Sequence, residues 1–284
     1  MPLTSDSTHA ERKEMQHLPK PSLIPLFFLL VIFLPSHIQA SQAEPQVGLY
    51  LHVIKTQTQN ILPLGQSSQL QVTLQVADPS QWQNLAAETD LTWVGTEQQQ
   101  VTLTVPANST FTSAPVSQHQ SPSWVIDYDH PEVAEVVDGV WQEHTKQPTL
   151  HQVHTFTDQN IPQKNYRNGF AIASQVVKRR EGDCTEHAVL GAAVARAADY
   201  AARVVLGLLL HRQQDEYVAY GHAWVEVHTE QGWQIIDPTT VAGQPTHHFY
   251  LPFAQLDNEG PGHGRTLLEF GLMRPTQISI TELP

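Results

Sequence analysis

The spacing of hydrophobic residues changes twice along this chain, and these changes limit the folds that the chain can adopt. Residues 70–76 and 101–105 alternate apolar and polar side chains at a period of two, as half-buried strands do. Beyond residue 130 the apolar residues first recur at helical spacing and then return to strand patterns. Predicted helices cover 131–141, 170–177 and 184–200, and predicted strands cover 203–210, 217–228 and 233–236. Helices followed by antiparallel strands indicate an α+β fold, preceded here by a small β-rich region.

The same pattern divides the chain into segments. Residues 44–120 are predicted to form a β-rich N-terminal domain that ends in a linker rich in Ser, Pro, Thr and Gln. Residues 121–251 hold the predicted helices and the later strands. Residues 252–284 are predicted to be a strand-rich tail, with two short strands after residue 266. The sequence leaves open whether this tail joins the sheet of the preceding segment.

Residues 1–43 are predicted to be a signal peptide. Residues 23–34 are strongly apolar, but this run of 12 is shorter than the roughly 20 residues that cross a bilayer as a helix. Lys13 and Lys20 precede the run and small residues follow it, as in secretory signals. We therefore expect a periplasmic or secreted protein with no membrane span in the mature chain. An uncleaved signal would instead anchor the protein in the membrane, and the long polar leader keeps that alternative open.

Charge and composition exclude several classes of partner. The chain carries 28 acidic and 15 basic residues, a net charge of −13, which disfavours binding to nucleic acid or anionic lipid. The pairs His151/His154 and His247/His248 have no second cysteine or carboxylate at ligand spacing, and we expect them to be solvated. The sequence predicts neither a metal site nor a cofactor.

Cys184 is the only cysteine, and its neighbours favour a chemical role. Cysteines of exported proteins usually pair, so a lone thiol there deserves an explanation. Asp183 and Glu186 have the spacing of a capping box, which places Cys184 at the first position of a helix. Free N–H groups at a helix N-terminus stabilise a thiolate, so we expect a lowered pKa for this thiol. Gly182 is expected to permit the sharp turn and the close approach of a substrate. A lone cysteine is more often a small buried hydrophobe, but these polar neighbours argue against a core position.

His222 and Asp237 are predicted to meet on one face of a hairpin. A short polar turn containing glycine separates their strands. Pairing His228 with Trp233 sets Asp237 opposite Trp224 and diagonal to His222, and a shift of two residues sets it directly opposite His222. A slip of one residue would separate them. On one face, His222 can accept the thiol proton of a cysteine while Asp237 orients the imidazole.

Four blocks of sequence together resemble a bacterial transglutaminase-like domain. The blocks are 182–188, 201–208, 221–227 and 233–238, within a resemblance that covers about 123–251. The resemblance implies a papain-like α+β core in which Cys184, His222 and Asp237 are nucleophile, base and orienting acid. One departure is that such domains usually carry Gly-Ile-Pro before the second block, whereas residues 199–201 are Asp-Tyr-Ala here. This departure affects the end of a helix and no catalytic position.

The resemblance implies an enzyme that acts on a protein or peptide. Such domains form a thioester with a glutamine side chain or a peptide amide, which an amine or water resolves, in cross-linking, deamidation or proteolysis. The alternative is a catalytically silent binding or assembly module in the cell envelope. By analogy with other thiol acyl transferases, the Cys184 backbone N–H would contribute to an oxyanion hole. Tyr166 and Gln175 are candidates for its second donor.

Overall fold

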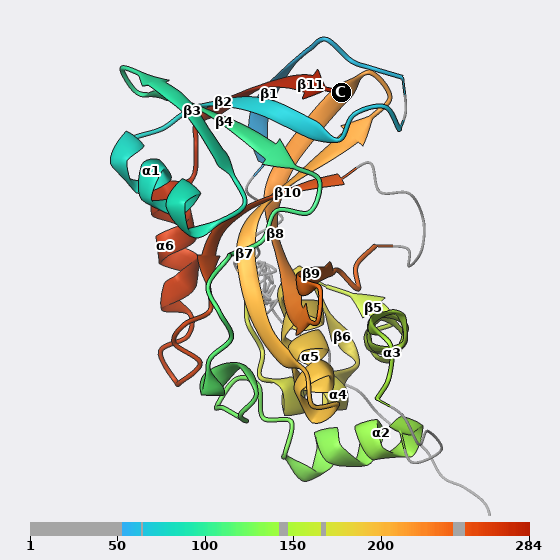
Figure 1. The fold of residues 1–284 in the computed structure, drawn as a ribbon. Helices are drawn as coiled ribbons and strands as arrows, with labels where there is room; N and C mark the ends of the chain where they lie inside the picture. Colours follow the sequence, from blue (N-terminus) through green and yellow to red (C-terminus); the bar gives the residue numbers. More distant parts are fainter. Residues whose placement is uncertain (1–52, 64, 142–146, 166–168, 241–247) are drawn as a thin grey trace, which may run out of the picture. The chain divides into compact units, whose positions relative to one another are not determined.

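The computed structural model describes residues 53–63, 65–141, 147–165, 169–240 and 248–284. A nine-stranded mixed sheet runs through this part of the chain (Figure 1). Its strands are β1 (Val53–Gln59), β2 (Gln69–Gln75), β3 (Thr92–Glu97), β4 (Gln100–Pro106), β7 (Ala201–Gln213), β8 (Glu216–Thr229), β9 (Gly232–Ile236), β10 (His248–Gln255) and β11 (Gln277–Leu283). The strand order is β10-β7-β8-β1-β11-β2-β4-β3, with β9 paired to β8. A separate parallel pair joins β5 (Gln163–Lys164) to β6 (Glu181–Gly182).

Helices gather in two places around this sheet. They are α1 (Pro79–Glu88), α2 (Pro131–Trp141), α3 (Leu150–Asn160), α4 (Ala173–Arg179), α5 (Cys184–Ala197) and α6 (Arg265–Met273), with a 3₁₀ turn η2 at Ser117–His119. The helices α2 to α5 cluster beside one end of the long strands β7 and β8, whereas α1 and α6 lie near β3, β4 and β10 (Figure 1). The α+β class predicted from the sequence is confirmed.

Local sequence explains two helices that the strand patterns did not predict. Residues 79–88, which lie in the region predicted to be β-rich, form α1 because Asp78 accepts a hydrogen bond from the Ser80 N–H at 2.9 Å and Trp82 and Leu85 bury one face. The prediction of a first short strand after residue 266 is wrong. That segment forms the helix α6, which buries Phe270 against the sheet. The second is β11.

β11 answers the question of where the C-terminal segment belongs. It pairs in parallel with β1 and antiparallel with β2, so it lies between two strands of the N-terminal region. β1 in turn pairs with β8, where Val53 faces Tyr220. The three segments predicted at 44–120, 121–251 and 252–284 therefore all contribute strands to one sheet. The division into domains at those boundaries stays a prediction.

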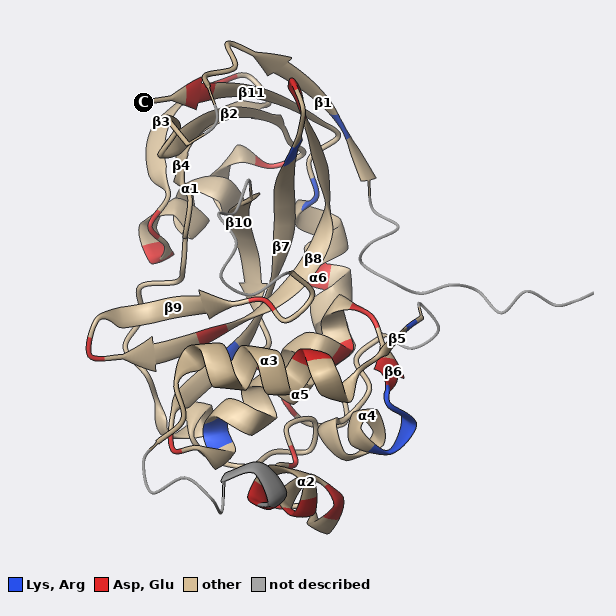
Figure 2. Ribbon diagram, turned by 90° about the vertical axis from the view of Figure 1, so that its right-hand side faces the viewer, with Lys and Arg blue, Asp and Glu red and all other residues tan. Residues whose placement is uncertain are grey.

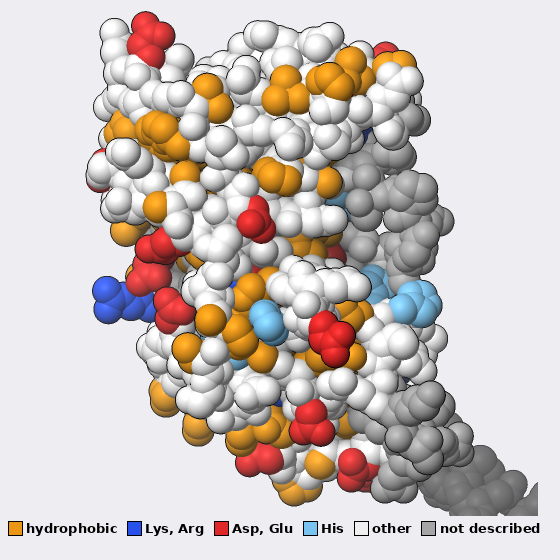
Figure 3. Space-filling view, viewed as in Figure 1, with side chains coloured by type: hydrophobic (Ala, Val, Ile, Leu, Met, Phe, Trp, Pro, Cys, Tyr) orange, Lys and Arg blue, Asp and Glu red, His pale blue; other side chains and the backbone are white. Residues whose placement is uncertain are grey.

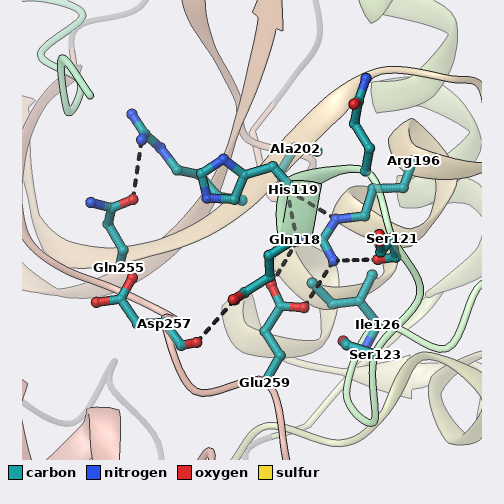
Figure 4. A network of polar contacts seen from close by, with 12 residues as sticks. Gln118, His119, Ser121, Ser123, Ile126, Arg196, Ala202, Gln255, Asp257 and Glu259 are labelled. Atoms are coloured by element: carbon teal, nitrogen blue, oxygen red, sulfur yellow. Dashed lines mark hydrogen bonds and ion pairs between the residues drawn. The ribbon is translucent and has the colours of Figure 1, made fainter. Parts of the chain in front are cut away.

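The segment expected to be a linker is fixed by two buried arginines. Arg196 of α5 donates to the Ser121 carbonyl at 3.0 Å and holds Glu259 with two hydrogen bonds of 2.8 and 2.6 Å (Figure 4). Arg203 of β7 donates to the Phe111 carbonyl at 2.6 Å and forms a buried ion pair with Glu226 of β8. Because these cations would be costly to bury without partners, the segment between β4 and α2 is part of the packed structure.

Acidic and basic residues are placed differently on the described part of the chain. Acidic residues lie along α2 (Figure 2), and on the face shown in Figure 3 Asp and Glu are scattered while Lys and Arg appear mainly at one edge. No helix among the described residues is long and apolar enough to cross a membrane. The predicted signal peptide at 1–43 lies outside the described residues.

Gly207 lies where the backbone of β7 packs closely on β10. A Cβ there would clash with the Leu251 carbonyl oxygen and lie 2.7 Å from the ring of Trp224. We expect Gly207→Ala to lower the free energy of unfolding by about 1–3 kcal/mol, measured by urea denaturation. Gly271→Ala is the matched control, because no atom lies within 4 Å of the new Cβ and alanine favours the helix α6 by up to about 1 kcal/mol. Equal stability of the two variants would contradict this account.

Candidate functional site

Cys184 is the first residue of α5, as the sequence predicted. The Asp183 carboxylate accepts a hydrogen bond from the Thr185 N–H at 2.9 Å, and Glu186 accepts one from the Asp183 N–H at 2.9 Å. This reciprocal capping box fixes where the helix begins and therefore where the sulfur lies.

Glu186 also ties this helix start to the preceding loop. Its other carboxylate oxygen accepts a hydrogen bond from the Ala171 N–H at 2.9 Å. Burial, and then the neighbouring Asp183 carboxylate, raise the pKa of Glu186 to about 8. A Cβ at Gly182 would lie 2.6 Å from the Glu186 Cγ, so glycine is required here by the packing of Glu186. The sequence had attributed this glycine to a turn and to the approach of a substrate.

His222 and Asp237 meet in the first of the two predicted registers. His228 pairs with Trp233 and Val225 with Ile236, which sets Asp237 diagonal to His222 at the end of the hairpin. Their side chains are joined by a hydrogen bond of 2.7 Å between His222 Nε2 and Asp237 Oδ2. Both side chains are buried, so this contact forms in a region of low dielectric.

Asp237 is held by four hydrogen bonds, three of which the sequence did not predict. Oδ2 also accepts from the Tyr250 hydroxyl at 3.0 Å, and Oδ1 accepts from the Thr239 N–H at 3.1 Å and the Thr239 hydroxyl at 2.6 Å. Burial alone would raise the pKa of Asp237, but His222 and Thr239 outweigh it and hold that pKa below its usual range. Thr239 stands two residues after the aspartate, where such bonds are common, but Tyr250 comes from β10 and gives no local signal.

A cavity of about 170 Å³ brings the cysteine and the histidine together. It is lined by Lys164, Asp183, Cys184, His187, Tyr220, His222 and Thr239. The helix α5 supplies the cysteine, the strand β8 supplies His222, and the turn after β9 supplies Thr239. All three residues predicted to act together are thus within one site, two of them lining the cavity and Asp237 behind His222.

The expected lowering of the Cys184 pKa is wrong for this structure. Burial first, and then the Asp183 carboxylate, raise the pKa of the thiol well above its ordinary value, and a hydrogen bond from the Ala223 N–H only partly opposes them. Cys184 is only 6% exposed. Desolvation of the sulfur and the neighbouring Asp183 carboxylate therefore both favour the neutral thiol.

The raised pKa of the Cys184 thiol can be tested directly by chemical modification. Because the pKa of Cys184 is raised above its ordinary value of 9.0, we expect alkylation by iodoacetamide at pH 8 to be slower than that of a small-molecule thiol, and to keep rising above pH 9. Mass spectrometry of the modified protein over a pH series measures the rate, with the Cys184→Ala protein as the unreactive control. A rate that is already maximal at pH 7 would indicate a resting thiolate.

The remaining sequence predictions concern the oxyanion hole and metals. Tyr166 lies outside the described residues, and the described residues that line the cavity do not include Gln175. His154 is buried in α3 and not solvated as expected, whereas His151 is exposed. Within the described ranges, no group of three or more His, Cys, Asp or Glu side chains could hold a metal ion.

One comparison with known proteins matches the part of the chain that holds this site. Residues 135–238 match the model of the transglutaminase-like superfamily, a span that contains Cys184, His222 and Asp237. No curated protein matches the chain by sequence.

Several solved structures are similar to this chain. A proposed cysteine protease from Cytophaga hutchinsonii is 14% identical, with a TM-score of 0.41 over 76% of this chain and 83% of that one. The periplasmic domain of TgpA from Pseudomonas aeruginosa is 19% identical, with a TM-score of 0.40 over 69% and 75%. Red sea bream transglutaminase is 13% identical, with a TM-score of 0.28 over 74% and 50%.

Proposed function

The chain contains a transglutaminase-like superfamily domain at residues 135–238, and we propose that it is an exported thiol enzyme acting on proteins or peptides. The enzyme forms a thioester at Cys184 with a glutamine side chain or a peptide amide, and an amine or water resolves it. The observation that carries this proposal is the shared cavity of Cys184 and His222, with His222 hydrogen-bonded to the buried Asp237. Nucleophile, base and orienting acid are the parts that thiol acyl transfer needs.

The hydrogen bond to Asp237 assigns the two nitrogens of His222. The Asp237 carboxylate accepts the Nε2 proton, which leaves the lone pair of the neutral imidazole on Nδ1. Nδ1 is therefore the atom that takes the thiol proton. Tyr250 and Thr239 hold the carboxylate in place, so the ring keeps Nε2 directed at Asp237 while Nδ1 gains and loses the proton.

Acylation begins from the neutral thiol. His222 removes the proton as the sulfur attacks the carbonyl carbon, forming the C–S bond and an oxyanion that the Cys184 backbone N–H helps to stabilise. The tetrahedral intermediate then breaks its C–N bond, and the leaving nitrogen takes the proton from His222. An amine or water next attacks the thioester carbonyl and gives its proton to His222. The C–S bond breaks, and the proton returns to the sulfur.

The proposal is tested by two assays on the purified protein. One measures incorporation of a labelled primary amine into a glutamine-containing protein, and the other measures cleavage of peptides. We expect product in at least one assay and none from the Cys184→Ala protein. Absence of product in both assays, together with a Cys184→Ala protein that still performs the cellular role, would favour the silent binding module.

Export is proposed on the sequence of residues 1–43 and has its own test. Cell fractionation followed by mass spectrometry of the mature N-terminus is expected to find the protein outside the cytoplasm, cleaved near residue 43. An intact N-terminus in the membrane fraction would indicate an anchored protein.

A further inference from the structure

His187 lies one helical turn after Cys184 on α5 and lines the same cavity. Residues three apart on a helix share a face, so the imidazole and the thiol approach the cavity from the same side. The mechanism above gives His187 no role. Its ring is nevertheless fully buried beside the nucleophile.

One hydrogen bond assigns the protonation of the His187 ring. Nδ1 lies 2.6 Å from the backbone carbonyl oxygen of Asp183, and a carbonyl can only accept, so Nδ1 carries a proton. Burial lowers the pKa of His187, which favours the neutral ring. In the neutral ring the lone pair is on Nε2, which is therefore a hydrogen-bond acceptor.

This acceptor has no partner among the described residues. Nε2 of His187 is buried and makes no hydrogen bond there, which is unusual for a polar atom in a protein interior. Two other polar groups of the cavity are engaged elsewhere: the Thr239 hydroxyl donates to Asp237, and the Lys164 ammonium contacts the Thr239 carbonyl at 3.4 Å. A ligand that fills this cavity can satisfy Nε2 only by presenting a donor.

We propose that His187 selects the acyl donor by accepting a hydrogen bond from its amide N–H. A carboxamide or peptide amide carries such a donor beside the carbonyl that Cys184 attacks, whereas an ester presents an oxygen lone pair at the same place. An acceptor nitrogen also cannot stabilise an oxyanion, so His187 lies outside the oxyanion hole. This inference rests on the proposed acyl transfer, and it names the residue that favours amides over esters as acyl donors.

Two substitutions separate this role from a structural one. His187→Asn places an amide N–H near the position of Nδ1, so it keeps the donor to Asp183 and removes the acceptor. His187→Gln places an amide oxygen near the position of Nε2, so it keeps an acceptor and loses that donor. The substrates are a blocked glutaminyl-glycine dipeptide and its γ-methyl ester analogue, compared by kcat/KM.

We expect His187→Asn to lower the amide-to-ester ratio of kcat/KM on the order of tenfold. His187→Gln should keep most of the wild-type ratio. If the role of His187 were purely structural, His187→Gln would lose more kcat/KM than His187→Asn. Each variant would then lose as much on the amide as on the ester. A change confined to the KM of the acceptor amine would also overturn the proposal.

A second readout does not depend on turnover. In the Cys184→Ala protein labelled with ¹⁵N-histidine, we expect the blocked glutamine dipeptide to shift the Nε2 resonance of His187, and the ester analogue to leave it in place. If the wild-type protein turns over neither substrate while this shift occurs, acyl transfer is wrong and the amide-binding role of His187 stands. If Nε2 does not respond to the amide, the inference about His187 is wrong whether or not the enzyme is active.

Discussion

Replacing His222 by alanine is expected to lower kcat/KM for acylation by about 10²–10⁴-fold, the usual contribution of a general base. The expectation is at the upper end of this range because the pKa of the Cys184 thiol is raised by burial, so little thiolate exists without the base. Single-turnover formation of the thioester, followed by mass spectrometry, measures the loss. The loss should shrink at high pH, where hydroxide removes the thiol proton without His222.

Tyr250→Phe is the matched control for His222→Ala. It removes one hydrogen bond of 3.0 Å to Asp237 and keeps the aromatic ring that packs on Trp224. Because the His222–Asp237 bond and both Thr239 bonds remain, the loss should be about tenfold or less. Acylation by His222→Ala at the rate of the Tyr250→Phe protein would show that His222 is not the base.

Replacing Arg203 by methionine is expected to cost about 3–5 kcal/mol of unfolding free energy, because it leaves the Glu226 carboxylate buried without its cation. Both side chains are at most 1% exposed, and the ion pair measures 2.7 Å. Arg203 also bonds the Phe111 carbonyl and stacks on Trp233 at 3.7 Å, so the segment before η2 should loosen as well. Urea denaturation with hydrogen exchange of residues 111–121 measures both effects.

The pH dependence of this variant follows from Glu226. Burial raises the pKa of Glu226 from 4.5 to about 7, against the opposing effect of Arg203. A carboxyl group whose folded pKa is raised contributes stability at low pH that is lost as the pH rises through that value. Without Arg203 the pKa rises further, so the cost of Arg203→Met should be smaller at pH 5 than at pH 9. The double variant Arg203→Met/Glu226→Leu should recover part of the loss, and no recovery would contradict the ion-pair account.

The sequence predicted the local geometry of Cys184, His222 and Asp237 better than it predicted the surrounding fold. The capping box of Asp183 and Glu186 and the hairpin register of His222 and Asp237 depend on spacings of a few residues, so they could be derived locally. Tyr250 could not, because its bond to Asp237 depends on where β10 pairs with β7.

Burial explains the other errors. The Cys184 pKa was predicted from the helix N-terminus alone, while the sulfur's desolvation depends on the whole cavity around it. The sequence gives no local signal that Arg196 and Arg203 are buried, and only the packed structure shows that they bond the segment before α2. The C-terminal strand had the right type but no predictable place, because its partners are more than 200 residues away in sequence.

The place of β11 means that the N-terminal sheet cannot be completed by N-terminal residues. One edge of β1 and one edge of β2 stay unpaired until residues 277–283 insert between them. A nascent chain therefore carries both unpaired edges until these residues have been made. A chain cut after Met273 lacks β11 and should leave a gap one strand wide between β1 and β2. A strand that fills this gap would pair in parallel with β1 and antiparallel with β2. A synthetic peptide of residues 274–284 has the pairing pattern to fill that gap, which makes this protein a candidate for reconstitution from two fragments.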